Sequence, residues 1–274
     1  VGSDGTHAYV IDRLAGSIAT IDVATRSLVG APRESGFFPS GVARAGNQVL
    51  VTNEGLMRYG VAAQTSATPP FRTVDPDDQR ASSLAVLPIN GDRTLGAGRA
   101  IPLDRPPDGI MNVGGAHPTA IVATPDGRYA FAAMTNVDRI AAIDLHAAQG
   151  APAVVGGTEL RLFDRAPYGT QPNALALTRD GSRLYVALAG LNAVAVLDAR
   201  DPVHLHRLGL IPTGWYPTAL ALSEDDRTLY VTNAKGLGQD RGFSGAEPSK
   251  VDAAGHVLKA VSYTHLTLPT ILRV

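Results

Sequence analysis

Apolar and polar positions alternate in short runs along this chain, and the runs recur in a fixed order. One copy begins at Pro172–Thr178, turns at Asp180-Gly181 and returns through Leu184–Ala187. Two further runs follow, Asn192–Asp198 and Leu205–Ile211. A period of two is typical of strands, and Asp-Gly favours a tight turn. This stretch therefore predicts four antiparallel strands joined by short turns.

The same sequence pattern occurs four times, beginning at Pro39, Pro118, Pro172 and Pro217. A fifth copy without its first part opens the chain and ends at Tyr9–Asp12. The last two repeated prolines are separated by the ~40–45 residues of a propeller blade. The sequence predicts an all-β fold, a β-propeller of four-stranded antiparallel blades, present here as an incomplete arc of four to five blades. A β-sandwich is the structural alternative, but sandwiches do not repeat one phrase in register.

Composition narrows the classes of function. The chain has 274 residues, 24 Lys and Arg against 25 Asp and Glu, and no cysteine. Balanced charge does not favour binding to nucleic acid, and no apolar run is long enough to predict a membrane span. With 29 glycines and 19 prolines, the chain suits many short strands joined by turns. The segment 55–80, which holds Pro69, Pro70 and Pro76, is expected to form a long loop.

Two quartets, Leu50–Asn53 and Tyr230–Asn233, resemble the signature of the YVTN family of bacterial propeller repeats. The stretch from about 165 to 240 is similar to the YncE-type propeller that precedes an alkaline-phosphatase-like phosphoesterase domain in bifunctional bacterial proteins. This resemblance implies a ring of about seven blades and a periplasmic or secreted location. It also implies a C-terminal phosphoesterase domain as a partner in the full-length protein. No catalytic residue of that domain matches a position in this chain.

The N-terminus is expected to lie inside a blade, and the last residues are expected to lie beyond the repeat. Residues 1–260 are expected to form the propeller domain, cut at both ends, with a first blade that lacks its innermost strand. Residues 261–274 do not fit the repeat and resemble a translated sequencing adapter, so we expect a non-native tail that hangs free or docks only opportunistically. An open arc should also leave apolar faces partly uncovered, and Leu220, Leu222 and Leu229 are expected there.

The residues just before the repeated prolines are the candidate ligand-binding residues, because this turn leads to one mouth of a propeller's channel. They are His117, Gln171, Trp215 and Tyr216, together with Phe37 and Phe38. Packing between blades is the alternative, and it is favoured because repeats use such positions in this way. Asn53, Asn233, Glu54 and Asp138 lie where the second strand turns into the third, where polar side chains are also ordinary turn residues.

Metal and catalytic sites are less supported. His204 and His206 share one face of a strand, but no third ligand can be named, so no metal and no cofactor are expected. The preferred function is a non-catalytic binding or scaffold module, with any phosphoesterase activity in the missing part of the parent protein. The alternative is a lactonase-like propeller acting on a sugar lactone. It needs a convergent His, Arg and carboxylate cluster, and the sequence shows none that repeats. A quinoprotein-like or metal-bearing propeller is a third reading.

Overall fold

The computed structural model describes residues 2–3, 5–55, 82–103, 115–147, 153–163 and 166–235, with the backbone of 262–267. Over these residues the regular elements are β-strands, apart from two single turns of 3-10 helix, Thr135–Val137 and Ala189–Leu191. The prediction of negligible helix is therefore confirmed for this part of the chain. The chain divides into two compact units, Val1–Val137 with Ala141–Gly156 and Asp138–Ile140 with Gly157–Val274, which we describe separately.

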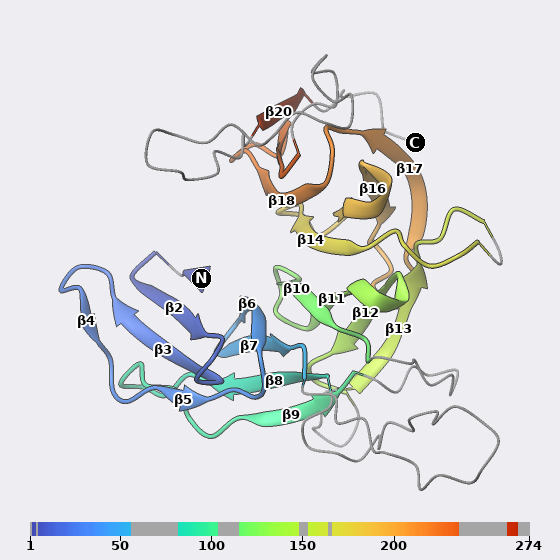
Figure 1. Cartoon of the computed structure of the whole chain (residues 1–274). Helices are drawn as coiled ribbons and strands as arrows, with labels where there is room; N and C mark the ends of the chain where they lie inside the picture. The colour runs from blue at the N-terminus through green and yellow to red at the C-terminus, as the bar shows by residue number, and fades with distance from the viewer. Residues whose placement is uncertain are drawn as a thin grey trace, which may run out of the picture. The chain divides into compact units, whose positions relative to one another are not determined.

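The first unit contains three sheets (Figure 1). The strands of the first are β1 (Gly2–Ser3), β2 (His7–Asp12), β3 (Ser17–Asp22) and β4 (Ser27–Leu28), with β5 (Arg33–Glu34) also paired to β3. Those of the second are β6 (Pro39–Ala45), β7 (Gln48–Asn53), β8 (Ser83–Pro88) and β9 (Arg99–Pro102). Those of the third are β10 (Pro118–Ala123), β11 (Tyr129–Met134), β12 (Arg139–Asp144) and β13 (Ala153–Glu159), whose last residues belong to the second unit.

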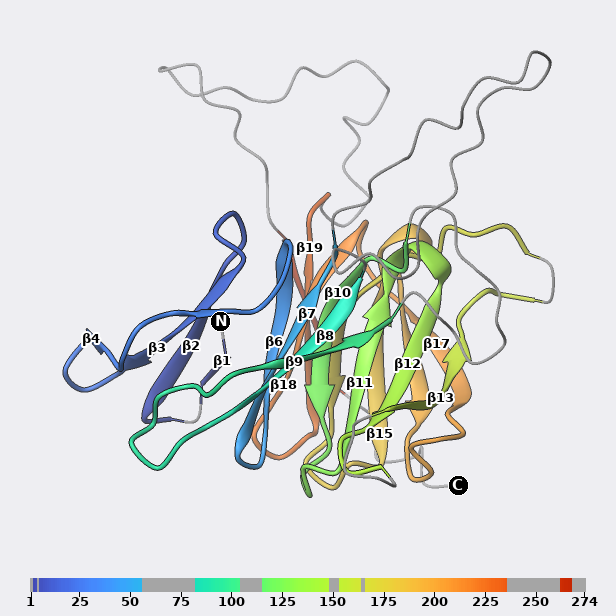
Figure 2. The ribbon, with the colours of Figure 1, turned by 90° about the horizontal axis from the view of Figure 1, so that it is seen from below.

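The second unit contains two more sheets. One is formed by β14 (Pro172–Leu177), β15 (Arg183–Leu188), β16 (Ala193–Asp198) and β17 (His206–Pro212). The other is formed by β18 (Pro217–Leu222), β19 (Thr228–Asn233) and β20 (Ser262–Thr267). Sheets with the spatial order first, second, third, fourth strand are propeller blades, so the predicted β-propeller fold is confirmed. In Figure 2, β6, β7 and β8 lie side by side, as their pairing requires.

The repeated proline marks the same irregularity in four sheets. The pairing of the first two strands shifts immediately after Pro39, Pro118, Pro172 and Pro217. Proline has no N–H to donate to a strand ladder, so a bulge at the first residue of the strand is where it is tolerated. The sequence repeat that begins at each of these prolines thus forms a hairpin with a bulge at the start of the blade.

Each sheet has two faces, which we name by chain order. Within a unit, the forward face of a sheet packs against the next sheet along the chain, and the backward face of that next sheet packs against it. In the first unit Tyr9 and Ile18 of the first sheet's forward face pack against Val49 and Val51 of the next sheet's backward face. In the second unit Tyr185, on the forward face of β14–β17, packs in one cluster with Leu229 of β19. Small and apolar side chains at alternate positions make these contacts close.

Two expectations about the ends are corrected in part. The first sheet has a remnant of its innermost strand, because Gly2 and Ser3 of β1 pair with Tyr9 and Ala8. Leu220 and Leu222 are partly exposed, as expected, whereas Leu229 is fully buried against the preceding sheet. The expected long loop lies almost entirely outside the described residues.

The segment 262–267 is a paired edge strand, because β20 aligns with all six residues of β19. It therefore neither hangs free nor lies in the centre of the sheet. Whether residues 261–274 are foreign to this fold stays a prediction.

Candidate functional site

Four corners of identical backbone precede the repeated prolines. In each, the residue before proline has a left-handed φ, and these residues are Phe38, His117, Gln171 and Tyr216, with φ from +51° to +59°. The corner carbonyl accepts a hydrogen bond from the residue that follows the second strand, as Thr135 N–H does to His117 O at 3.2 Å. Non-glycine residues rarely adopt this φ, so the four copies show a backbone position that the fold requires.

Side chains from the preceding sheet hold two of these corners. Asp138 is almost fully buried, and its carboxylate accepts the N–H of Gly169 at 2.7 Å and the N–H of Gln171 at 3.0 Å. Asn192 accepts the N–H of Tyr216 on its Oδ1 at 2.9 Å. Asp138 and Asn192 themselves have left-handed φ, which Asp and Asn tolerate best among residues other than glycine. Both side chains therefore act as clasps between consecutive repeats.

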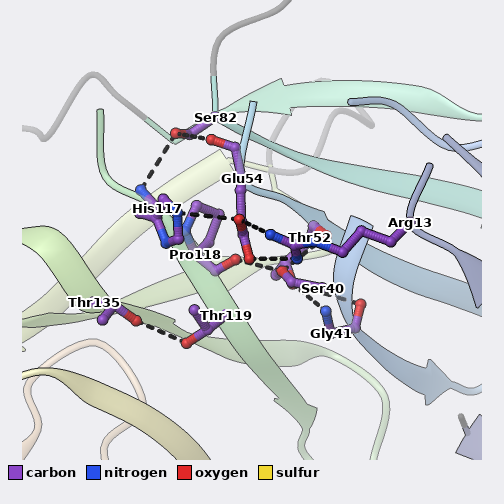
Figure 3. Close-up of polar contacts among 10 residues, drawn as sticks. All are labelled: Arg13, Ser40, Gly41, Thr52, Glu54, Ser82, His117, Pro118, Thr119 and Thr135. Carbon is purple, nitrogen blue, oxygen red and sulfur yellow. Dashed lines mark hydrogen bonds and ion pairs between the residues drawn. The ribbon is translucent and has the colours of Figure 1, made fainter. Parts of the chain in front are cut away.

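The second corner along the chain, at His117, carries a charged cluster (Figure 3). Both Glu54 carboxylate oxygens accept hydrogen bonds from the Arg13 guanidinium, the Nη1–Oε1 distance being 2.6 Å. The Nε2 atom of His117 lies 3.1 Å from Glu54 Oε2. The carboxylate side chain is only 9% exposed, whereas those of Arg13 and His117 are 50% and 42% exposed. The buried carboxylate of Glu54 thus contacts the half-exposed side chains of Arg13 and His117, which come from different sheets of the first unit.

Neighbouring hydroxyls fix the backbone around this cluster. The Ser82 hydroxyl donates to the Glu54 carbonyl at 2.9 Å and accepts the N–H of His117 at 3.4 Å. The Ser40 hydroxyl donates to the Pro118 carbonyl at 2.6 Å, which ties the first strands of two sheets together. Figure 3 shows these groups converging on the Arg13–Glu54–His117 cluster. The cluster is therefore held by the backbone on both sides as well as by its own charges.

The electrostatics of the cluster favour a closed ion pair. The hydrogen bonds that Arg13 donates to Glu54 raise the pKa of Arg13 above its ordinary value, so the guanidinium remains charged. The Arg13 guanidinium carbon also lies 5.8 Å from the centroid of the Phe38 ring. Nδ1 of His117 is buried and has no hydrogen-bond partner among the described residues. Neither imidazole nitrogen is therefore presented to solvent as a free base.

The fourth corner is more open. Trp215 is 40% exposed, and the Lys235 ammonium lies 4.8 Å from the centroid of the Tyr216 ring. The backbone N–H of Lys235 also donates to the Trp215 carbonyl at 3.1 Å. This corner, which Asn192 holds, thus carries the exposed indole of Trp215, the phenol ring of Tyr216 and the ammonium of Lys235. Such a group can stack on a ring and attract an anion.

The other candidate residues lie elsewhere. Asn53 and Asn233 are fully buried at the ends of β7 and β19, and the Asn53 amide donates to the Ser35 carbonyl at 2.8 Å. His204 and His206 are exposed, and His204 Nδ1 lies 3.0 Å from Asp201 Oδ2. The described residues contain no group of three or more side chains of the metal-ligating types. The structure therefore gathers two groups of candidates, one around His117 and one around Trp215 and Tyr216.

Sequence reasoning missed the partnership of Arg13 and Glu54. Glu54 was interpreted as a turn residue, and no cluster of His, Arg and carboxylate was found. Both residues occupy one repeat position, the first residue after the second strand. The later sheets have smaller, uncharged side chains there, namely Thr135, Ala189 and Ala234. An alignment of the repeats would have shown opposite charges at this position in consecutive blades.

Among the described residues, no helix is long and apolar enough to cross a membrane. Comparison with protein-family models and with curated proteins finds no match.

Solved structures give the fold. The chain is similar to a candidate 6-phosphogluconolactonase from Bacteroides uniformis, with 21% identity and a TM-score of 0.61 over 84% of this chain and 62% of that one. It is also similar to a protein of unknown function from Desulfotomaculum acetoxidans, with 16% identity and a TM-score of 0.56 over 85% and 61%. A chain of the nidogen–laminin complex gives 17% identity and a TM-score of 0.51 over 87% and 76%. The chain thus spans about three fifths of the length of the first two proteins, and it shares the β-propeller fold of its structural neighbours.

Proposed function

We propose that this chain is a non-catalytic β-propeller module that binds its ligand at the corner of Trp215, Tyr216 and Lys235. The observation that supports this is the exposed indole beside an ammonium that is already held over a ring. Aromatic faces bind rings by stacking, and a single ammonium attracts a phosphate or carboxylate. The ligand class that fits is a small ring compound with an anionic group, such as a phosphorylated sugar.

The wider setting of the module follows from the sequence resemblance. A YncE-type propeller beside a phosphoesterase domain would act outside the cytoplasm and would present phosphate-bearing compounds or a partner domain to that enzyme. We propose the same arrangement for the parent protein of this chain. In this arrangement the chemistry belongs to the partner domain, and the propeller supplies binding and position.

The chain contains a direct reporter for this proposal, because Trp215 is its only tryptophan. Titration with glucose 6-phosphate should change the Trp215 fluorescence in a saturable way, and glucose or inorganic phosphate alone should bind more weakly. Lys235→Gln should weaken binding of the phosphorylated sugar more than binding of glucose. If none of the three compounds changes the fluorescence or competes with another, the binding proposal fails.

The Arg13–Glu54–His117 cluster favours one alternative, a lactonase. In that reaction a base takes a proton from water, the hydroxide adds to the lactone carbonyl, and the protonated base returns the proton to the ring oxygen as the ring C–O bond breaks, which gives a hydroxy acid. Arg13 would stabilise the oxyanion, and His117 would be the base oriented by Glu54. The observed geometry favours a structural role instead, because His117 Nε2 faces Glu54 and Nδ1 is buried.

A simple assay separates these two roles. Acid release from glucono-δ-lactone should not exceed the spontaneous rate if the cluster is structural. Turnover that His117→Gln abolishes, with the fold intact by circular dichroism, would establish the lactonase alternative and displace the binding module.

A further inference from the structure

The chain contains one Asn-Gly dipeptide, Asn90-Gly91, which lies in the turn between β8 and β9. Both residues are exposed. Asparagine before glycine is chemically labile, because the glycine backbone nitrogen can attack the side-chain carbonyl carbon of the asparagine and no Cβ obstructs it. Most backbone N–H groups of a folded protein are hydrogen-bonded, so the reaction depends on whether the turn leaves this nitrogen free.

The turn leaves the nitrogen of Gly91 free to react. Among the described residues the Gly91 N–H has no hydrogen-bond partner. A Cβ built at Gly91 would meet no atom within 4 Å, so there is space for a ring to close. The Asn90 side-chain nitrogen donates one exposed hydrogen bond, to Thr94 Oγ1 at 3.0 Å. The nucleophile therefore lies one residue from its carbonyl carbon, and only an exposed contact has to break for the two to meet.

Two other turns show the opposite arrangement. They contain the pairs Asp126-Gly127 and Asp180-Gly181. In each, the glycine N–H donates to the carbonyl of the threonine before the turn, Thr124 at 2.8 Å and Thr178 at 2.9 Å. The hydroxyl of the same threonine donates to the aspartate carboxylate. Hydrogen bonds thus hold both reacting groups in these turns, whereas the nitrogen of Gly91 is unbonded.

We propose that Asn90 is a site of spontaneous deamidation and isoaspartate formation in the folded protein. The Gly91 nitrogen loses its proton and bonds to the Asn90 side-chain carbonyl carbon, and the amide nitrogen takes up a proton and leaves as ammonia. Water then opens the resulting succinimide ring. Cleavage of the bond between nitrogen and the side-chain carbonyl carbon gives aspartate. Cleavage at the main-chain carbonyl carbon gives isoaspartate, in which the chain continues through the former side chain.

Isoaspartate changes the turn as well as its charge. The Asn90 N–H donates to the Thr94 carbonyl at 2.9 Å, and the Asn90 carbonyl accepts the N–H of Arg93 at 3.0 Å. Isoaspartate adds one carbon to the main chain at this point and turns that carbonyl into a free carboxylate. The base of the turn is closed by the Gly96 N–H, which donates to the Pro88 carbonyl at 2.8 Å. We expect this closure to loosen, so the Gly96 amide should exchange with solvent faster after conversion.

Ageing of the folded chain at mildly alkaline pH, followed by proteolysis and mass spectrometry, tests the site. The peptide that contains Asn90 should give two products, each heavier by the difference between an amide and an acid. An isoaspartyl methyltransferase should label only one of them. Gly91→Ala should lose most of the conversion, because a methyl group shields the nitrogen, and the open space at Gly91 accommodates it. Asn90→Gln should lose it as well, because the longer side chain has to close a larger ring.

Asp180→Asn is the matched control, because it creates an Asn-Gly pair in a turn whose glycine N–H is hydrogen-bonded. The new asparagine should keep its amide in the folded chain and lose it in urea, whereas Asn90 should convert in both conditions. An Asn90 peptide that keeps its amide in the folded chain overturns the proposal. Conversion at position 180 as fast as at Asn90 in the folded chain also overturns it. Hydrogen exchange at Gly96 should be faster in the aged chain than in aged Gly91→Ala, and equal exchange overturns the expected loosening.

Discussion

Two corners of this molecule share one backbone and differ in what their side chains do. At His117 the corner is closed, because Arg13 and Glu54 from two other sheets satisfy one another and the imidazole. At Tyr216 the side chain that holds the corner from the preceding sheet is the uncharged Asn192, and Trp215 and Lys235 are exposed beside it. The left-handed residue before proline is common to both, with φ of +52° and +59°.

The difference shows how a repeat protein separates architecture from function. The corner backbone, the bulge after proline and the hydrogen bonds that close the hairpin recur in four sheets. Arg13 and Glu54 link sheets at the His117 corner, whereas the residue that corresponds to Glu54 before the Tyr216 corner is the uncharged Ala189. The same repeat position thus carries charges at one corner and none at the other, and fold alone does not assign a role to either.

The largest expected effect is removal of the clamp. Glu54→Ala should lower the free energy of unfolding by about 2–3 kcal/mol, because it leaves Arg13 without its carboxylate and opens a space under His117. Urea denaturation followed by circular dichroism measures this loss. The fluorescence of Trp215 in the folded protein should not change, since Trp215 lies in the other unit.

Glu159→Ala is the matched control, because its pair with Arg161 lies on the surface, with the carboxylate side chain 43% exposed. Surface ion pairs contribute about 0–1 kcal/mol, so this variant should unfold almost like the unmodified chain. Equal effects of the two substitutions would show that Glu54 is not a clamp.

The second effect concerns the open corner. Asn192→Ala removes the hydrogen bond to Tyr216 and places alanine, which tolerates φ +53° less well than asparagine, at this position, so we expect a loss of about 1–2 kcal/mol. Asn192→Gly removes the same hydrogen bond but tolerates this φ, so it should cost less. Both variants should increase acrylamide quenching of Trp215, because the corner loses its clasp. Unchanged quenching in both would show that Asn192 does not position this corner.

The propeller fold was predictable from sequence because its signal is local and repeated. Alternation of apolar residues, the Asp-Gly turns and the proline phrase specify each hairpin without reference to distant residues. The candidate residues His117, Gln171 and Tyr216 were found for the same reason, since each directly precedes a repeated proline. Of the three leucines expected to be partly exposed, Leu220 and Leu222 are, and Leu229 is buried. All three belong to the face that packs on the preceding sheet, as strand alternation requires.

The Arg13–Glu54–His117 cluster was not predictable in this way. Its members come from three sheets, and Arg13 and Glu54 are separated by 41 positions in the sequence. Each looks like an ordinary turn residue in its own repeat. Their contact depends on how consecutive sheets are stacked, which only a comparison of equivalent repeat positions could have suggested.

A smaller effect is expected from aspartates in the turns. Unlike the two corners, these turns should lose stability at acid pH. Hydrogen bonds from Arg200 lower the pKa of Asp198 to about 2. Hydroxyl groups of Thr124, Thr178 and Ser223 lower the pKa values of three turn aspartates, Asp126, Asp180 and Asp225. Because the folded pKa values lie below 3.8, the ordinary value for aspartate, these carboxylates stabilise the fold above that pH.

The stability that they provide should be lost as the pH falls from 3.8 towards about 2. The thermal midpoint should therefore be nearly constant from neutral pH to about pH 5 and should fall below about pH 4. Arg200→Gln removes the main cause of the Asp198 shift, so the decrease should be smaller in that variant. An unchanged acid profile in Arg200→Gln would show that this pair does not contribute.

The smallest effect is expected for the segment that completes the last sheet. Residues 262–267 pair with β19, but their sequence Ser-Tyr-Thr-His-Leu-Thr lacks the apolar run and final Asp of the third strands β12 and β16. A strand contributes mainly through the side chains that it buries, so a segment without that pattern should add little stability. Deletion of residues 261–274 should leave the thermal midpoint unchanged, whereas deletion of β17 as a matched edge strand should lower it. If deletion of 261–274 destabilises the protein as much as loss of β17 does, the segment belongs to the blade and the adapter interpretation is wrong.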